Sequence, residues 1–328
     1  MDYIEIQGYK SIKEQRIDFK KINILIGANG SGKSNFLSFF EFLKNLYQQN
    51  LQEYVALRGG VDKFLHNGRK ITNEISFKVE FDNSKNGYAA TLKTGYNGFV
   101  FSDERLIDHG KDIVKFRKYH FHDTGAQSPF SKMSHIKNDI YYLYEKGNNL
   151  AAFLYNIQQK KPIIYNRIVK TIQSVASYFS DFFLEPNAGD YISLQWKDKF
   201  SDVTYGVNDL SDGTIRFIAL TTLFMQPDLP QTIIIDEPEL GLHPAAIAKL
   251  SGMIQSAAAK DCQIIIATQS TDLIGYFAPE DILTIDQING ETVFKRLDSK
   301  ELAVWLNDYT IDDLWKRSII ATGQPNFQ

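Results

Sequence analysis

Cysteine, net charge and long apolar runs are all scarce in this sequence. Cys262 is the only cysteine among 328 residues, which excludes an intramolecular disulfide and fits a reducing compartment. The formal net charge is only −3, which argues against a protein that is basic throughout, although local basic patches remain compatible with it. No window reaches the roughly 18 apolar residues of a membrane span, and the first residues lack a secretory leader pattern. We therefore expect a cytoplasmic protein without a membrane partner.

A glycine-rich segment, ILIGANGSGKSNF at residues 24–36, stands out from this composition. It matches G-x-x-x-x-G-K-[ST] without deviation, with Lys33 and Ser34 at its last two positions. Glycines let successive backbone N–H groups converge on phosphates. Lys33 is expected to reach the β and γ phosphates, and the Ser34 hydroxyl is expected to hold Mg²⁺. The residues predicted to contact the nucleotide are Asn29, Gly30, Ser31, Gly32, Lys33, Ser34 and Asn35.

The flanking patterns place this loop between a strand and a helix. KINILIG at residues 21–27 runs apolar like a buried strand, and KSNFLSFFEFLKNLYQ at residues 33–48 has apolar residues at helical spacing. The positive end of that helix would face the bound anion. A chance glycine-rich turn is the plainer alternative, and the strand and helix on either side argue against it. The sequence therefore predicts a site for ATP and Mg²⁺.

Two adjacent acids follow a second apolar run in PQTIIIDEPELGLHP, residues 230–244. Asp236 is positioned at the end of a predicted strand to support the Mg²⁺ shell, and Glu237 to polarise the attacking water. Adjacent acids at a strand end are also compatible with a solvated turn. The complete phosphate loop elsewhere in the chain makes the catalytic interpretation the better one.

A helix start with an anion-binding character lies between these motifs, in NDLSDGTIRFIALTTLF at residues 208–224. Ser211 is a good helix cap, and the exposed amides around Gly213 would bind an anion. Taken alone, Ser-Asp-Gly is a common helix start, so the functional interpretation depends on the order of the motifs. That order is a phosphate loop, a long insert, Leu-Ser-x-Gly and then Asp-Glu.

This order resembles the ATP-binding-cassette superfamily, in particular its RecF-like and SMC-like branch, which includes the ATPase part of OLD-type nucleases. The opening YIEIQGYKSIKEQRIDFKKINILIGANGSGKSN is similar to the start of that branch, and the motifs cover residues 1–80 and 200–275. The resemblance implies an α/β fold: an ABC-type P-loop NTPase head, with a mixed β-sheet core with helices and an inserted α+β lid subdomain. It also implies a nucleotide sandwich in which Ser211 and Gly213 of one protomer cap the γ-phosphate held by another.

Two positions depart from the family pattern. After CQIIIATQS, Gln269 stands where many members carry a histidine that contacts the γ-phosphate, and an amide can hydrogen-bond there but cannot titrate. GGVDKFLHNG occupies the region of the metal-sensing glutamine loop, where His66 is the best polar candidate, with a structural histidine as the alternative. We expect slow turnover. By resemblance His243 lies in a dimer-facing loop, while Pro244 beside it opens a helix.

The patterns divide the chain into four regions. Residues 1–82 carry the first part of the ATPase core, and the alternation of EISFKVEF predicts a strand there. Residues 83–200 form an inserted lid with helical stretches NNLAAFLYNIQQ and PIIYNRIVKTIQSVASYFSDFF. Residues 201–295 return to the core, and residues 296–328 form a helical tail. No run sustains apolar heptads, so we expect no coiled-coil arms.

One segment of the insert, KFRKYHFHDT, has two specific functional interpretations. His120, His122 and Asp123 are candidate metal ligands, because alternate strand positions share a face. The other interpretation is a nucleic-acid surface in which cations contact phosphates and rings stack on bases. It would use Lys115, Arg117, Lys118, Phe116, Tyr119 and Phe121. The plainer alternative is a solvated strand face with its aromatic side in the core.

The tail KELAVWLNDYTIDDLWKRSIIATGQPNFQ has aromatic and leucine residues at roughly helical spacing, namely Trp305, Leu306, Tyr309, Leu314 and Trp315. Such residues usually dock a helix onto the domain's own core, and a partner-binding foot is the alternative. Compact ATPases of the resembled branch often end in a similar segment and are commonly encoded beside a second protein.

The leading hypothesis is a Mg²⁺-dependent ATPase that forms a homodimer or larger homo-oligomer around ATP. It would control DNA processing or a separately encoded effector protein in DNA repair or antiphage defence, with DNA as a further candidate partner. The alternative is a scaffold that binds ATP, hydrolyses little and restrains a partner toxin or nuclease. A transporter subunit fits less well, because of the SMC-like opening and the long insert. We expect no internal nuclease domain of the kind that OLD-type nucleases append.

Overall fold

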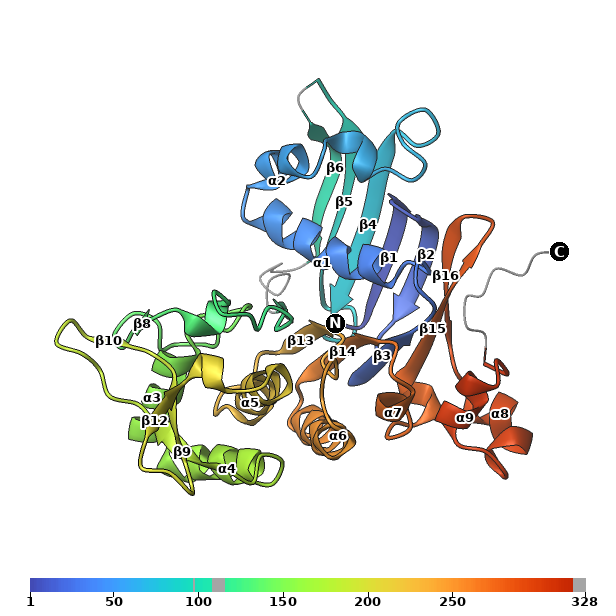
Figure 1. Ribbon diagram of the computed structural model, residues 1–328. Coiled ribbons are helices and arrows are strands. Elements are labelled where there is room, and N and C mark those ends of the chain that lie inside the picture. Colours follow the sequence, from blue (N-terminus) through green and yellow to red (C-terminus); the bar gives the residue numbers. More distant parts are fainter. Residues whose placement is uncertain (97, 108–115, 321–328) are drawn as a thin grey trace. The chain divides into compact units, whose positions relative to one another are not determined.

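The computed structural model describes residues 1–96, 98–107 and 116–320, and its chain divides into two compact units (Figure 1). Unit 1 comprises Met1–Lys118, Gln231–Asp236 and Gln263–Gln328. Unit 2 comprises Tyr119–Pro230 and Glu237–Cys262. Each unit therefore contains segments that are distant in sequence.

The first sheet of unit 1 is antiparallel, with the strand order β2-β1-β4-β5-β6. Its strands are β1 (Tyr3–Tyr9), β2 (Ile12–Asp18), β4 (Glu74–Phe81), β5 (Asn86–Thr94) and β6 (Phe99–Ile107). Buried and more exposed residues alternate along most of β4, as expected for a sheet with one face in the core. β5 and β6 fall within the region of the expected insert, yet they complete this sheet.

Helix α1 (Lys33–Tyr47) supplies most of the aromatic core against which this sheet packs. Phe36, Phe39, Phe40 and Phe42 are fully buried, and Phe39 and Phe42 make edge contacts with the ring of Phe77 in β4. Burying four phenylalanine rings removes a large apolar area from water, and each such ring contributes about 1.5–3 kcal/mol. The helix that follows the phosphate loop is thus anchored by its side chains.

The second sheet of unit 1 has the order β16-β15-β3-β14-β13-β7. Its strands are β3 (Ile22–Ile26), β7 (Phe116–Tyr119), β13 (Thr232–Asp236), β14 (Gln263–Thr268), β15 (Ile282–Ile288) and β16 (Glu291–Arg296). β13, β14, β3 and β15 pair in parallel, and β16 returns antiparallel to β15. All five residues of β3 are buried, which explains why its sequence runs apolar without alternation.

The remaining helices divide between the units. Those of unit 1 are α2 (Leu51–Leu57), α7 (Thr271–Ile274), α8 (Ser299–Leu306) and α9 (Ile311–Lys316). Those of unit 2 are α3 (Leu150–Lys160), α4 (Pro162–Gln173), α5 (Asp212–Met225) and α6 (Pro244–Ala258). Unit 2 also holds short strands β8 (Ser134–His135), β9 (Phe179–Phe183), β10 (Tyr191–Ile192), β11 (Gln195–Asp198) and β12 (Thr204–Gly206).

Most of the elements expected from periodicity are confirmed. The strand at β3, the helix at α1, the strand at β4 and the helix at α3 all lie where the patterns place them. The prediction of one long helix over PIIYNRIVKTIQSVASYFSDFF is wrong: α4 ends at Gln173, and Phe179–Phe183 forms β9. Ser174 and Ser177 lie between the two elements, and β9 is the aromatic run FSDFF. Aromatic residues favour strands where an edge is available for pairing. Here β11 provides that edge.

For α9, the structure supports the interpretation that the tail docks onto the domain's own core. Leu314 in α9 is fully buried, whereas Trp305 in α8 is 44% exposed. Ile311 and Leu314 of α9 are buried, and Leu302 and Leu306 of α8 are partly buried. In the described part of the chain, no helix has both the length and the apolar composition that crossing a bilayer requires.

Replacing Phe39 with alanine is expected to lower the free energy of unfolding by roughly 3–5 kcal/mol, because the cavity left behind cannot collapse. Its ring lies 4.9 Å from the ring of Tyr9 and 5.5 Å from that of Phe77. Urea denaturation measures the change. Tyr47→Ala is the matched control, since Tyr47 is on the same helix and 53% exposed. Equal stability of the two variants would contradict the assignment of Phe39 to the core.

Candidate functional site

The carboxyl ends of three parallel strands bring the sequence motifs of unit 1 to one edge of the second sheet. Ile26 of β3 pairs with Thr268 of β14, and Asp236 of β13 pairs with Ala267 of β14. The phosphate loop, Asp236 and Gln269 therefore all lie at the same edge of the sheet. In open α/β sheets this edge is where ligands bind.

The phosphate loop has the features of an anion site. Lys33 is buried, and its Nζ donates hydrogen bonds to the carbonyl oxygens of Gly27 and, at 2.9 Å, Ala28. Ser31 Oγ is buried and has no hydrogen-bond partner among the described residues. A buried ammonium close to an unsatisfied hydroxyl is costly unless an anion completes the site. The residues present therefore fit the phosphates of a nucleotide.

Thr292 of β16 contacts the phosphate loop, and no sequence pattern predicted this contact. A side chain at Gly32, which has φ 112°, would overlap Thr292. The Thr292 Oγ1 lies 2.7 Å from Ser11 Oγ and 3.1 Å from the Ser31 carbonyl oxygen. Asn35 Nδ2 donates to the same Ser11 Oγ at 2.8 Å. A single threonine in a β-hairpin carries no sequence signal for this role.

A cavity of about 580 Å³ adjoins the start of α1 within unit 1. Lys10, Ser11 and Asn35 line its side nearest the phosphate loop, and Tyr54 and Phe64 provide aromatic surface. Burial lowers the pKa of Lys10, and the nearby Arg58 guanidinium lowers it further. Lys10 Nζ donates to Ser38 Oγ at 2.7 Å. The cavity thus combines cations, amides, aromatic rings and the Asp62 carboxylate near the start of α1.

His66 lies in the same region with both ring nitrogens occupied. Its Nδ1 is 2.8 Å from the Lys10 carbonyl oxygen, and its Nε2 is 3.1 Å from Asn67 Nδ2. The carbonyl can only accept, so Nδ1 donates and Nε2 accepts from the amide. His66 is also only 3% exposed. This geometry favours the structural role over that of a metal ligand.

The acidic pair sits at a sharp change of backbone direction. Asp236 is the last residue of β13, and Glu237 follows with φ 40°, a left-handed conformation that is uncommon for a residue with a side chain. Such strain is often found at functional sites. Gln269 directly follows β14 and is exposed. The structure thus places Asp236 and Gln269 on neighbouring strands at one edge.

In unit 2, the Leu-Ser-x-Gly segment forms the beginning of α5. Ser211 Oγ caps the helix by accepting from the Thr214 backbone N–H at 3.2 Å, and Ser211 itself is exposed. A side chain at Gly213 would overlap the carbonyl oxygen of Gly241, in the loop after the acidic pair. Glycine is therefore required at position 213 by close backbone packing inside unit 2.

Arg216 connects three parts of unit 2 and was not anticipated from the sequence. It is 4% exposed, and its guanidinium donates to the carbonyl oxygens of Phe121 at 3.1 Å, His122 at 3.2 Å and Leu240. Burial lowers the pKa of Arg216, although an arginine remains charged at neutral pH. Helix α5, the loop after Glu237 and the insert are therefore joined by one buried cation.

The KFRKYHFHDT segment does not form a base-stacking surface. Phe116, Tyr119 and Phe121 are all buried, so the proposed stacking is wrong and the core alternative is correct. Lys118 pairs with Glu41 at 2.6 Å, and Lys115 lies outside the described residues. The His120 and His122 rings lie 4.2 Å apart, but the described residues contain no group of three acids, histidines or cysteines able to hold a metal.

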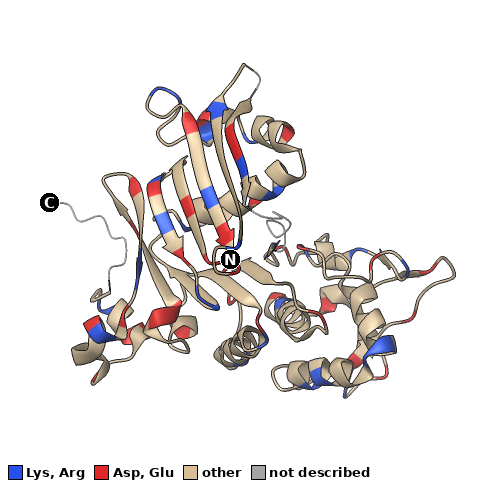
Figure 2. Ribbon diagram, turned by 180° about the vertical axis from the view of Figure 1, so that it is seen from behind, with Lys and Arg blue, Asp and Glu red and all other residues tan. Residues whose placement is uncertain are grey.

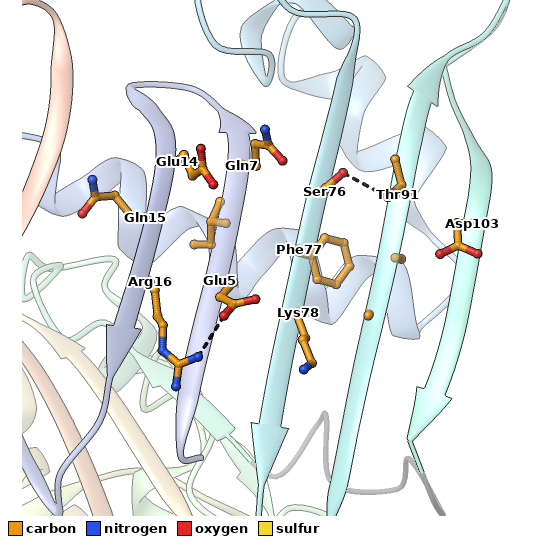
Figure 3. Close-up of a pocket in the computed structure, with 13 residues that line it drawn as sticks. Glu5, Gln7, Glu14, Gln15, Arg16, Ser76, Phe77, Lys78, Thr91 and Asp103 are labelled. Atoms are coloured by element: carbon orange, nitrogen blue, oxygen red, sulfur yellow. Dashed lines mark hydrogen bonds and ion pairs between the residues drawn. The ribbon is translucent and has the colours of Figure 1, made fainter. Parts of the chain in front are cut away.

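Another cavity, of about 370 Å³, lies on the open face of the antiparallel sheet (Figure 3), and none of the predicted site residues lines it. Its lining includes Glu5, whose carboxylate pairs with Arg16 at 3.0 Å. Both signs of charge are present along these strands (Figure 2). A surface of mixed charge lacks the basic stripe that phosphate backbones require.

Comparison with known proteins identifies the family. A family model described as "AAA domain, putative AbiEii toxin, Type IV TA system" matches residues 22–275, more than half of the chain, and the chain belongs to this family. A segment of 119 residues is 38% identical to structural maintenance of chromosomes protein 3 from Arabidopsis thaliana. This match covers 34% of the chain but spans only 9% of that relative's length.

Solved structures support the same fold. The chain is similar to an Smc head bound to the C-winged helix domain of ScpA, with TM-score 0.61 and 16% identity over 92% of this chain and 98% of that one. It is also similar to the SMC head domain from Thermotoga maritima, with TM-score 0.52 and 14% identity over 90% and 98%. The chain is thus a P-loop ATPase domain with the SMC head fold, as the motif order implied.

Thr292→Val is expected to weaken ATP binding by about 1 kcal/mol, close to fivefold in Kd, because it keeps the shape of the side chain but removes the hydroxyl between Ser11 and Ser31. Titration with a fluorescent ATP analogue measures the affinity. Thr292→Ser is the control, since it retains the hydroxyl. An unchanged Kd in the valine variant would remove Thr292 from the support of the loop.

Arg216→Met is expected to destabilise the protein by roughly 2–4 kcal/mol, because three carbonyl oxygens lose a charged donor. Urea unfolding measures the loss. Arg167→Met on α4 is the control, since Arg167 is exposed. If the two variants unfolded at the same urea concentration, Arg216 would not hold unit 2 together.

Proposed function

We propose that the protein is a Mg²⁺-dependent ATPase that dimerises around ATP and uses the nucleotide to switch the state of a partner. The observation that carries this proposal is the shared sheet edge, where the phosphate loop, Asp236 and Gln269 meet. Membership of the AAA-domain family supports it. Most of the catalysis would come from positioning and charge neutralisation.

The side chains have distinct roles in this proposal. Lys33 exchanges its carbonyl partners for oxygens of the β and γ phosphates, which its burial favours. Ser34 and Asp236 hold Mg²⁺, which supplies charge neutralisation. Glu237 orients a water molecule and accepts its proton, and Gln269 hydrogen-bonds near the γ-phosphate. The cavity beside Lys10 takes the nucleoside.

Dimerisation would complete the site. The exposed start of α5 presents Ser211 and the amides around Gly213 to the γ-phosphate held by a second protomer. The exposed His243, which caps α6, lies in the loop packed against that helix start. We further propose that residues 1–82 and 201–295 supply the ATPase core, with the inserted region as its lid.

The output would be control of a separately encoded effector, in the cytoplasm, in DNA repair or antiphage defence. The family description names a putative toxin of a toxin–antitoxin system, and the similar Smc head was solved with a bound ScpA domain. Both favour a partner protein over an isolated enzyme. DNA remains a candidate ligand, with no single surface assigned to it.

A second candidate is an ATP-dependent scaffold that hydrolyses little and restrains its partner. The observation that favours it is Gln269 at the position of the switch histidine, because an amide cannot take up a proton. Strained Glu237 beside Asp236 favours hydrolysis instead.

ATP turnover distinguishes these functions. We expect slow hydrolysis by the wild-type protein, and loss of at least about tenfold in Lys33→Ala, since the phosphate contact is removed. Turnover is measured for the protein alone, with single- and double-stranded DNA, and with the product of the neighbouring gene. Stimulation by DNA indicates a DNA-responsive enzyme, and a response to the neighbour alone indicates a switch on an effector. If Lys33→Ala hydrolysed ATP as fast as the wild type, the proposed ATPase site would be refuted.

Glu237→Gln is expected to trap an ATP-bound dimer, because binding is retained while the proton acceptor is lost. Light scattering coupled to gel filtration, with and without ATP, measures the mass. Lys33→Ala in the same background should abolish the ATP-induced dimer. A Glu237→Gln protein that stays monomeric at saturating ATP would refute the nucleotide sandwich.

A further inference from the structure

Helix α8 in unit 1 presents an apolar surface that its own chain does not bury. None of its residues is buried, and Val304 and Trp305 are 78% and 44% exposed. Ala303, Val304 and Trp305 are its exposed apolar residues, whereas Leu302 and Leu306 are partly buried. A helix of eight residues is marginal in water without tertiary packing. An exposed apolar helix of this kind marks an interaction site.

Acidic residues accompany this helix. Asp298 caps its start by accepting from the Lys300 backbone N–H at 2.8 Å, and Asp308 follows its end. Glu301 pairs with Lys295 at 2.7 Å, but both side chains are at least 60% exposed. An exposed ion pair of this kind contributes little to stability, so Glu301 can form an ion pair with another cation instead. Lys300 also lies on the helix, so residues 298–309 carry three acidic residues and one lysine and are acidic overall.

Unit 2 contains a groove of complementary character. It has a volume of about 320 Å³ and lies between α4, the end of α5 and α6. Its apolar lining includes Ile164, Phe224, Met225 and Met253. The charged residues that line it are Arg167, Lys249 and Lys260, and no acidic residue lines it. The groove thus offers an apolar floor and a basic rim.

Gly252 keeps the middle of this groove open. It is exposed, lies in the interior of α6, and a Cβ built on it would meet nothing within 4 Å. Glycine at an interior helix position costs roughly 1 kcal/mol relative to alanine. A side chain here would project into open space that helix packing within the chain does not use.

We propose that α8 of one copy of this chain docks into the α4–α6 groove of a second copy. Trp305 would be the aromatic anchor, since indole rings are enriched at the centres of interfaces. Asp298, Glu301 and Asp308 would face Arg167, Lys249 and Lys260. The contact joins two different surfaces, so it is heterologous and separate from the nucleotide sandwich. It needs no ATP and extends assembly beyond the nucleotide-dependent dimer.

Sedimentation velocity of the full chain without nucleotide, over a range of protein concentrations, tests this contact. We expect the wild type to self-associate, and Trp305→Ala and Gly252→Leu each to raise the dissociation constant at least about tenfold. Tyr47→Ala is the control for loss of an exposed aromatic and should associate like the wild type. A wild type that stays monomeric throughout, or association unchanged in both variants, would overturn the proposal.

Charge reversal provides a second test that does not depend on packing. Asp308→Lys and Lys249→Glu should each weaken association, and a mixture of the two single variants should recover it, because opposite charges then face each other in trans. Failure of the mixture to recover would contradict this pairing of surfaces.

A labelled synthetic peptide of residues 298–309 serves as a direct probe. We expect it to bind the Trp305→Ala chain, whose groove is intact, and not the Gly252→Leu chain, as measured by fluorescence anisotropy. If an unrelated acidic amphipathic peptide bound the groove and the 298–309 peptide did not, the occupant would be a different protein and the second-copy proposal would be wrong. All measurements omit ATP, so they are independent of the proposed ATPase.

Discussion

The parallel register of β3, β14 and β13 is the constraint on which the candidate site depends. The three strands come from opposite ends of the sequence, yet their pairing aligns their carboxyl ends to within a residue. Fully buried strands cannot shift register without exposing apolar side chains or leaving backbone groups unpaired. The core of the sheet therefore holds the phosphate loop, Asp236 and Gln269 at one end of the three strands.

Much of this arrangement was predictable from the sequence because local chemistry demands it. The phosphate loop needs glycines at fixed spacing, and the strand before it and the helix after it have unambiguous apolar patterns. The fold of the core was implied by the resemblance of the motif order to the ATP-binding-cassette superfamily and is confirmed by the SMC head structures. These features depend on residues that are close in sequence or on a family pattern that spans the chain.

The parts that were not predicted depend on long-range packing. Thr292 reaches Gly32 from 260 residues further along the chain, and nothing around it signals that contact. The end of α4 at Gln173 depends on β11, which offers an edge to β9. The aromatic residues of KFRKYHFHDT appeared suited to stacking on bases, but burial of Phe116 and Phe121 decided their role. Local pattern cannot determine which face of a strand meets the core.

Two contacts in unit 2 link the motifs that follow the insert. Gly213, at the start of α5, packs directly on Gly241, and Arg216 one turn later donates to the carbonyl oxygen of Leu240. Both partners lie in the loop that begins at Glu237, the residue with strained backbone. Because close-packed backbones cannot move independently, any change in that loop must also displace the start of α5. The helix cap at Ser211 is therefore mechanically coupled to the residue proposed to activate water, within one protomer.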